Sequence, residues 1–528
     1  MVSTAVVLGL TVVTLASLSA LGLWFSRGSV GSVEDLLTAR NSAHSGRMTA
    51  TLVASVMGVW ILLSAPEAGA SFGIAAVIGY TIGEAVPMLV YAKLGPRIRE
   101  LVPDGHSLTE YAHARYGPAM YAFVLMVSCL YMFIFLAAEL TGIASALSLV
   151  AGVPQWQTAV LVGGFVVLYT TYGGLRASIL TDTIQALVVL PLLVLALGGA
   201  VFALGGADTI HANIITTNPT LLDPGFVPGL QFGFGLAFAI LGAELINQTW
   251  WQRIYAGVDS ETVGRSFRRA SVTNGLIIFL AGLFGLVAAG SADIVTDVSS
   301  SAYNADVAFF ILLQSAFPEW LVVAVVLLAL LLVMSSVDTL FNALASVVTA
   351  DLPRLLSDPN DRTLTIGARA LTIISAVGAV YVSLRARSVL RLFLFADLLG
   401  AAVAIPLIYG LYSRRLTGAG ALVSSLAGLA VGLVYFPDFS GIIRSVPVLG
   451  GLLPAPDSLY LTAFGGAFVV SSVLTVLAAQ VSTTAYDHDE LGTEISRLSD
   501  ARTDGGQRET EAQTAATQDS NADDEVSN

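Results

Sequence analysis

Charge is scarce in this chain: only 12% of its 528 residues are Asp, Glu, Lys or Arg, whereas 55% are apolar, and the mean hydropathy is +0.79. Soluble proteins of ordinary composition carry about twice this fraction of charge. The shortage excludes a soluble globular fold. It predicts an all-α polytopic membrane protein, because helices satisfy their own backbone hydrogen bonds inside a lipid bilayer.

Cysteine and histidine are also scarce. Cys129 is the only cysteine, so neither an intrachain disulfide nor a cysteine metal cluster can form within the chain. The five histidines all fall in predicted loops or in the C-terminal tail, which argues against a buried histidine metal site or a haem. No nucleophile–base pair, zinc motif or phosphate-binding loop is found. We expect no enzymatic activity and no organic cofactor.

Lysine is almost missing, because Lys93 is the only one among 24 basic residues, and the net charge is −13. From Tyr486 onward twelve acids stand against three arginines, which gives a net charge of −9. We expect residues 484–528 to form a disordered acidic tail. The acid excess is typical of a halophilic composition and offers no basic surface for nucleic acid.

Long apolar runs are the most abundant feature. A membrane helix needs about 20 consecutive apolar residues, and about thirteen stretches qualify. They are approximately 5–25, 49–73, 76–95, 118–150, 157–174, 179–204, 230–248, 270–293, 319–348, 366–386, 390–412, 417–436 and 460–482. We read the first as a retained membrane helix, because it has no basic n-region and is too long for a signal peptide.

The basic residues indicate an orientation, because cytoplasmic loops are enriched in Lys and Arg. With the N-terminus outside, most basic residues fall in inner loops, including Lys93, Arg253 and Arg414, and the tail is cytoplasmic. Outer loop 205–229 has no basic residue. Arg385, Arg387 and Arg391 disagree, because they would lie outside. The majority of the basic residues favours this orientation, and we predict a multi-pass protein of the cell membrane.

Two apolar segments are interrupted in the middle. One reads WILLSAPEAGASFG (60–73) and the other LGAELINQTWWQR (241–253). They are five segments apart, so each can open a five-helix unit. Paired broken helices indicate a transporter with a 5+5 inverted-repeat core, whose unwound backbone coordinates ions and solute at mid-membrane. A kink without function is the alternative, since Pro and Gly are common in membrane helices.

Four motifs resemble the sodium:solute symporter family. They are YTTYGGLRASILTDTIQ (169–185), SVEDLLTARNS (32–42), WWQRIYAG (250–257) and IYGLYSRRLTGAGALVSSLAG (408–428). The loop GHSLTEYAHARYG (105–117) resembles the urea-transporting branch. The resemblance implies a leucine-transporter-like fold with broken first and sixth core helices, and sodium-coupled import of a small polar solute by alternating access.

The resemblance also implies a sodium site between the first and eighth core helices. Its ligands are the backbone carbonyls of Ala54, Met57 and Leu332 and the hydroxyls of Ser335 and Ser336. Hydroxyl and carbonyl oxygens suit such a cation, although membrane serines also bond to the carbonyl four residues earlier. Val56 stands where the proline-transporting branch has an aspartate.

Two further acids are assigned to the cation path. By resemblance Asp182 belongs to the inner sodium exit, although a helix cap with Thr181 would also explain it. Asp338 lies one turn beyond the two serines, where it either compensates for Val56 or forms a local helix-stabilising hydrogen bond.

Ionisable residues within membrane spans usually face a cavity. Here they include Glu84, Glu139, Glu244 and Asp397. The predicted solute-site residues are Trp60, Glu139, Glu244, Asn247 and Asp397. Carboxylates without a basic residue favour a solute that is rich in N–H donors or positively charged, so urea or an amino compound is favoured over proline, sugars and monocarboxylates. The alternative is that these carboxylates only stabilise packing. We assign Trp250 and Trp251 to an interfacial aromatic belt.

These predictions divide the chain into four parts. Residues 1–48 form a first membrane helix and inner loop, 49–412 the transport core, 413–483 two peripheral helices, and 484–528 the tail. Two functions compete with symport: a passive channel for a small neutral solute, and a transporter-like sensor that signals through a partner.

Overall fold

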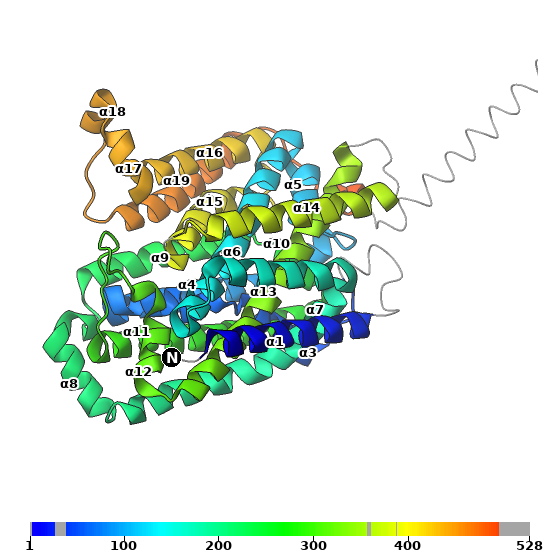
Figure 1. Ribbon diagram of the computed structural model, residues 1–528. Helices are drawn as coiled ribbons and strands as arrows, with labels where there is room; N and C mark the ends of the chain where they lie inside the picture. The colour runs from blue at the N-terminus through cyan, green and yellow to red at the C-terminus, as the bar shows by residue number, and fades with distance from the viewer. Residues whose placement is uncertain (1–2, 27–38, 356–360, 387, 496–528) are drawn as a thin grey trace, which may run out of the picture.

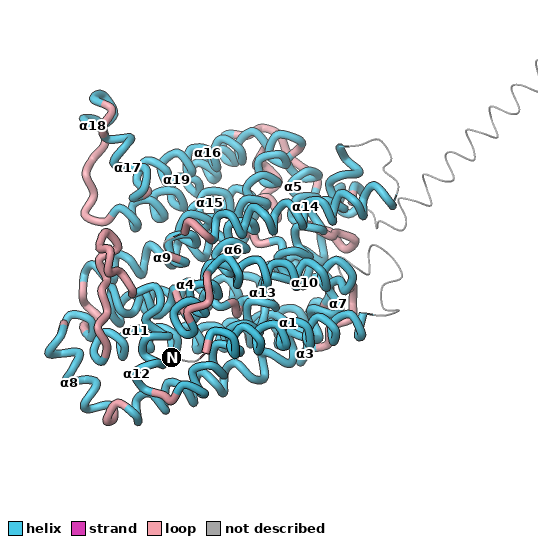
Figure 2. Tube along the Cα trace, in the orientation of Figure 1, coloured by secondary structure: helices cyan, strands magenta, loops and turns pink. Residues whose placement is uncertain are grey.

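The computed structural model describes residues 3–26, 39–355, 361–386 and 388–495, and these residues form helices joined by loops (Figure 2). The helices are α1 (Thr4–Ser26), α3 (Ser45–Val56), η1 (Val59–Leu62), α4 (Ser64–Leu101), α5 (Leu108–Tyr116), α6 (Pro118–Ala151), α7 (Gln155–Ala203), α8 (Ala207–Thr217), η2 (Pro219–Leu222), α9 (Val227–Leu245), α10 (Gln248–Ala256), α11 (Ser260–Ser291), η3 (Ala305–Val307), α12 (Ala308–Ala316), α13 (Glu319–Leu355), α14 (Asp361–Ser383), α15 (Val389–Tyr409), α16 (Gly418–Tyr435), α17 (Pro437–Arg444), α18 (Pro447–Leu452), α19 (Leu459–Val481), η4 (His488–Glu490) and α20 (Leu491–Glu494).

The all-α membrane architecture is confirmed. In the described residues eight helices are long and apolar enough to cross a membrane, and a pair bent by 77° between 203 and 207 allows a ninth. Shorter apolar helices at Thr4–Ser17, Gln155–Leu168, Ala305–Ala316 and Arg369–Ser383 fall below that length. The count of thirteen therefore stays a prediction.

The first broken helix begins with α3, which ends at Val56. The backbone leaves helical geometry at Met57 (φ −80°, ψ 87°), and η1 starts two residues later. A second departure follows at Gly73 (φ 73°, ψ −166°), within α4. An interruption is confirmed, but it extends from Met57 to Leu63 and so begins before the predicted stretch 60–73. The bend at Gly73 separates the predicted spans 49–73 and 76–95.

The second broken helix consists of α9 and α10. α9 ends at Leu245, and α10 begins at Gln248. Asn247 caps the new helix, because its side chain accepts a hydrogen bond from the backbone N–H of Thr249 (3.0 Å). Tyr91 donates to the carbonyl oxygen of Leu245 at 3.0 Å, which satisfies one acceptor freed by the break.

The two halves pack around these breaks. α4 packs along α11 and α9, and α15 packs against α9 and α6. In Figure 1, α16 and α19 lie along one edge of the bundle and α1 lies on the opposite edge. The core positions are thus enclosed, while the edge helices present many of their apolar side chains outward, as lipid requires.

Candidate solute and cation sites

Three carboxylates meet around a small cavity between the two halves. The cavity has a volume of about 20 Å³, which is room for about one water molecule. Its lining comes from η1, α4, α6, α9 and α15, and consists of Trp60, Tyr80, Glu84, Tyr131, Phe135, Ile240, Glu244, Phe393 and Asp397. None of these lining residues is Lys, Arg or His.

Glu244 is held at the end of α9 by three donors. The Tyr131 hydroxyl donates to its Oε1 at 3.2 Å, while the Trp250 indole N–H and the Asn247 amide (3.5 Å) donate to Oε2. These bonds fix the carboxylate at the break between α9 and α10. The prediction of an interfacial belt is wrong here, because Trp250 and Trp251 are only 1% and 0% exposed. They pack inside the protein, where α10 turns inward.

Glu84 and Asp397 complete the acidic group, and both are buried. Oε2 of Glu84 has no hydrogen-bond partner, which is unusual for a buried oxygen. In the described residues no group of three His, Cys, Asp or Glu side chains could hold a metal ion. The three carboxylates therefore line one cavity without forming a metal-chelating set.

Aromatic rings form the remaining wall of the cavity. Trp60 stacks on Tyr80 with 6.0 Å between ring centroids and lies 5.4 Å from Phe393. Phe135 meets Phe393 edge-on at 4.6 Å. Ring faces attract ammonium and guanidinium groups. Together with the carboxylates, they make a surrounding that suits an organic cation.

Close backbone contact between α9 and α15 positions two of the acids. A Cβ at Gly242 would lie 2.4 Å from Cα of Ala401, and one at Gly400 would lie 2.3 Å from Cα of Ala243. Only glycine permits these distances. Glu244 lies two residues after one glycine and Asp397 three before the other, so the contact brings both acids to the same cavity.

The predicted solute-site residues divide into two groups. Trp60, Glu244 and Asp397 line the cavity. Asn247 does not line the cavity, but its side-chain amide donates a hydrogen bond to Glu244, which does. Glu139 is fully buried on α6, and its Oε2 accepts a hydrogen bond from the backbone N–H of Val59 at 3.0 Å. Glu139 therefore lies against the first break, beside Trp60.

The predicted sodium ligands belong to α3, the residue after it and α13, and α13 packs against α3 and η1. Ala54, Met57, Leu332, Ser335 and Ser336 are all at most 2% exposed. The Ser336 hydroxyl has no hydrogen-bond partner. An orphaned buried hydroxyl beside an interrupted helix fits a cation ligand, since Na⁺ would supply the missing interaction.

Arg253 joins the two broken helices near these serines. The sequence prediction placed it in an inner loop, which is wrong, because Arg253 is fully buried on α10. Its guanidinium donates to the hydroxyls of Thr51 on α3 and Thr339 on α13, both at 3.2 Å. The inward course of α10 after the break buries this arginine. Asp338, next to Thr339, is also buried, and the Asp182 side chain lies outside the described part of α7.

A second polar cluster forms around Glu67 in the first turn of α4, after the first break. Glu67 is buried on α4 and accepts hydrogen bonds from the hydroxyls of Tyr303 and Ser388. Tyr303 belongs to the 292–304 loop, and Ser388 caps α15. Beside them lies a cavity of about 220 Å³ whose lining includes Ser71, Phe232 and Tyr460. We call the Glu67–Tyr303–Ser388 cluster the latch.

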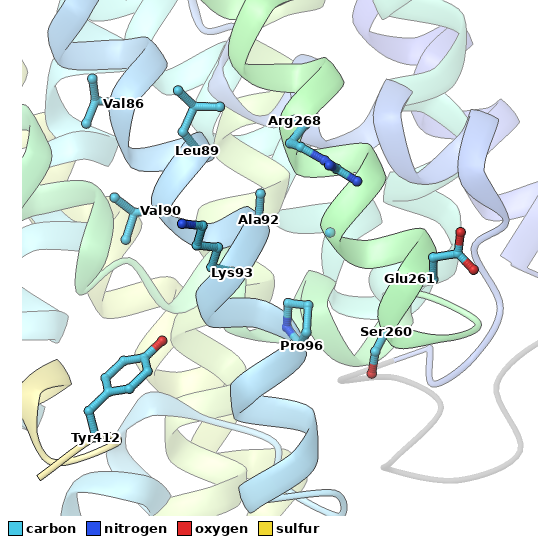
Figure 3. Close-up of a pocket in the computed structure, with 11 residues that line it drawn as sticks. Val86, Leu89, Val90, Ala92, Lys93, Pro96, Ser260, Glu261, Arg268 and Tyr412 are labelled. Atoms are coloured by element: carbon cyan, nitrogen blue, oxygen red, sulfur yellow. The ribbon is translucent and has the colours of Figure 1, made fainter.

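A larger cavity lies away from the interrupted backbone of the two broken helices. It has a volume of about 810 Å³ and opens between α4 and α11 (Figure 3). Its walls are mostly apolar, with Lys93 on one helix and Arg268 on the other. Size does not identify the functional site here, because this groove contains none of the interrupted backbone.

Comparison with known proteins agrees with this geometry. The family model of the sodium:solute symporter family matches residues 37–428. The chain belongs to the sodium:solute symporter family. It is therefore a multi-spanning membrane transporter.

Relatives and a solved structure extend the match over the whole core. The spermidine transporter DUR31 of Candida albicans is 28% identical over 477 residues, covering 88% of this chain and 87% of that protein. A probable urea active transporter of Schizosaccharomyces pombe is 26% identical over 162 residues, 31% of this chain and 24% of that protein. A Na⁺-coupled sialic acid symporter, solved in a substrate-bound outward-open state, has the same fold (TM-score 0.71, 17% identity, 91% and 98% coverage).

Within this symporter fold, sequence reasoning missed several residues. Glu84 carried a signal, because it is an ionisable residue in a membrane span. Tyr80, Tyr131 and Phe393 carried none, since aromatic residues are common in apolar helices. Arg253 was hidden by the positive-inside rule, which assigns arginines beside a span to loops.

Proposed function

We propose that this symporter imports a small amine-bearing organic cation of the polyamine class together with Na⁺. The observation that carries the proposal is the lining of the cavity, where Glu84, Glu244 and Asp397 face aromatic rings with no basic residue among them. The cavity of about 20 Å³ would have to widen as the two halves move apart to admit the amine. Buried carboxylates are costly unless a partner compensates their charge. A protonated amine supplies both the charge and the N–H donors.

The coupling ion is assigned to the first break. Ala54, Met57 and Leu332 would offer backbone carbonyls and Ser335 and Ser336 hydroxyls. Support comes from their common burial and from the orphaned hydroxyl of Ser336. When bound, Na⁺ would join α3 to α13 and so favour one arrangement of the broken helix. Asp182 and Asp338 remain the proposed residues of the cation path.

The comparisons favour amines over the second candidate, urea. A relative that is 28% identical over 88% of this chain is named a spermidine transporter, whereas the urea transporter matches 31% of this chain. Urea is also rich in N–H donors, but it carries no charge to compensate the carboxylates. The geometry therefore supports a cationic solute better.

The orientation is also a proposal. The N-terminus would face outside and the tail the cytoplasm of a cell membrane, because most arginines then lie inside. The latch and the 292–304 loop would then face outward. Residues 49–412 would form the transport core and 413–483 the peripheral helices.

The test is an uptake screen with the purified protein in liposomes. Labelled spermidine, putrescine, urea, proline, glucose and lactate are offered with an inward Na⁺ gradient and with K⁺ in its place. We expect Na⁺-dependent uptake of the amines alone. Preference for urea, or for any carboxylate, would overturn the assignment of the solute.

A further inference from the structure

We propose that Glu139 occupies the backbone N–H site at the first helix break and thereby excludes solutes that carry a carboxylate. In transporters with broken helices, free backbone N–H groups face the anionic group of the solute. Here the protein supplies that anion from its own α6. This inference rests on the proposed function, and it names the feature by which the site separates amines from amino acids.

The contact geometry defines the role of Glu139. Its Oε2 accepts the Val59 N–H at 3.0 Å, and a carboxylate is a strong acceptor for backbone N–H groups. The other oxygen, Oε1, has no hydrogen-bond partner although the residue is 0% exposed. A carboxylate in this position leaves no room for a second one on the same N–H.

Gly58 allows the carboxylate to come this close. A Cβ at position 58 would lie 1.7 Å from Oε1 of Glu139, well inside any permitted contact. Gly58, which precedes the N–H donor Val59, thus leaves the space that the Glu139 carboxyl group occupies. Any larger residue at 58 would force the carboxylate off the break.

Glu139 lies on the same face of α6 as two residues that line the solute cavity. Tyr131, Phe135 and Glu139 recur every four residues, so they share one face of the helix. Tyr131 and Phe135 line the cavity, and Phe135 lies 6.5 Å from Trp60, the residue after Val59. The Glu139 carboxyl group is therefore placed next to the lining residues, on the backbone N–H that a solute carboxylate would need.

The test compares putrescine with γ-aminobutyrate, which have similar lengths but differ by one carboxylate in place of an amine. Competition against labelled putrescine is measured for the reconstituted wild-type protein, Glu139→Ala and Glu139→Gln. Wild type should bind putrescine and reject the amino acid. In Glu139→Ala the ratio of the two inhibition constants should shift towards the amino acid by about tenfold or more, because the N–H becomes available.

The Glu139→Gln variant distinguishes the effect of the negative charge from the effect of occupying the Val59 N–H. Its amide oxygen can still accept the Val59 N–H, so we expect a smaller shift in the same direction, and this variant also serves if Glu139→Ala does not fold. Glu100→Gln, at an exposed carboxylate, is the matched control and should leave the ratio unchanged.

Two results would overturn the proposal. One is a wild-type protein that takes both compounds equally well. The other is a pair of Glu139 variants that weaken putrescine without changing the ratio, as a merely structural role predicts. Failure of the proposed function would give a different result, because the wild-type protein would then take up neither putrescine nor spermidine.

Discussion

At the residue scale, a buried carboxylate is costly unless hydrogen bonds or a cation compensate it. Glu244 receives three donors from Tyr131, Asn247 and Trp250. Glu84 has a free oxygen, and Asp397 lies across the same cavity. Under the proposed function, Glu244 would orient the site while Glu84 and Asp397 would contact the solute.

Replacing Asp397 tests this division. Asp397→Asn keeps the shape and removes one negative charge, so the KM for spermidine should rise about tenfold or more. The measurement is the concentration dependence of Na⁺-driven uptake. Glu261→Gln, which removes an exposed carboxylate, should change nothing. An unaltered KM in Asp397→Asn would remove this carboxylate from the solute site.

The orphaned hydroxyl of Ser336 gives a second prediction. Ser336→Ala removes one proposed oxygen ligand, so the Na⁺ concentration for half-maximal uptake should rise about tenfold, equivalent to one buried polar contact. The control is Ser424→Ala, because Ser424 is an equally buried serine that bonds to the carbonyl of Gly420. An unchanged Na⁺ dependence would place the cation elsewhere.

At the element scale, the latch joins the 292–304 loop to α4 and α15. Hydrogen bonds to a carboxylate contribute about 1.5–3 kcal/mol each. Tyr303→Phe removes one of them, so the loop should open more often. The readout is maleimide labelling of Ser71→Cys in a Cys129→Ser background, since Ser71 lines the cavity beside Glu67.

We expect Tyr303→Phe to speed this labelling about tenfold or more, the population change that a loss of about 1.4 kcal/mol produces. Tyr412→Phe, at an exposed tyrosine, is the matched control. Equal labelling rates in the two variants would show that the latch does not control access.

The same loop should respond to pH through Asp306 on η3. Burial raises the pKa of the Asp306 carboxyl from 3.8 to about 6, and Glu67 and Tyr303 lie nearby. The closed loop favours the neutral acid, so this stabilisation is complete below about pH 4 and is lost as the pH rises through about 6.

Hydrogen exchange of the 292–304 loop, corrected for the intrinsic pH dependence, measures this effect. Protection should fall between pH 5 and pH 7 in the wild-type protein. In Asp306→Asn it should stay level over the same range. A fall of equal size in both proteins would assign the transition to another group.

At the scale of the whole molecule, strong signals in the sequence were recovered well. Apolar runs predict membrane helices because lipid leaves few other backbone structures, and the interruptions at 60–73 and 241–253 mark both breaks. The site was recovered in part. Trp60, Glu244 and Asp397 meet at one cavity, whereas the burial of Arg253 and Trp250 depends on the inward turn of α10, which no local pattern encodes.

The central claim is that a Na⁺ gradient drives amine import. Its most direct test is the steady-state accumulation of labelled spermidine in proteoliposomes at fixed membrane potential while the inward Na⁺ gradient is varied. The account predicts accumulation above the equilibrium level that increases with the gradient and disappears when K⁺ replaces Na⁺. Spermidine that only equilibrates, whatever the Na⁺ gradient, would contradict symport and indicate a passive channel.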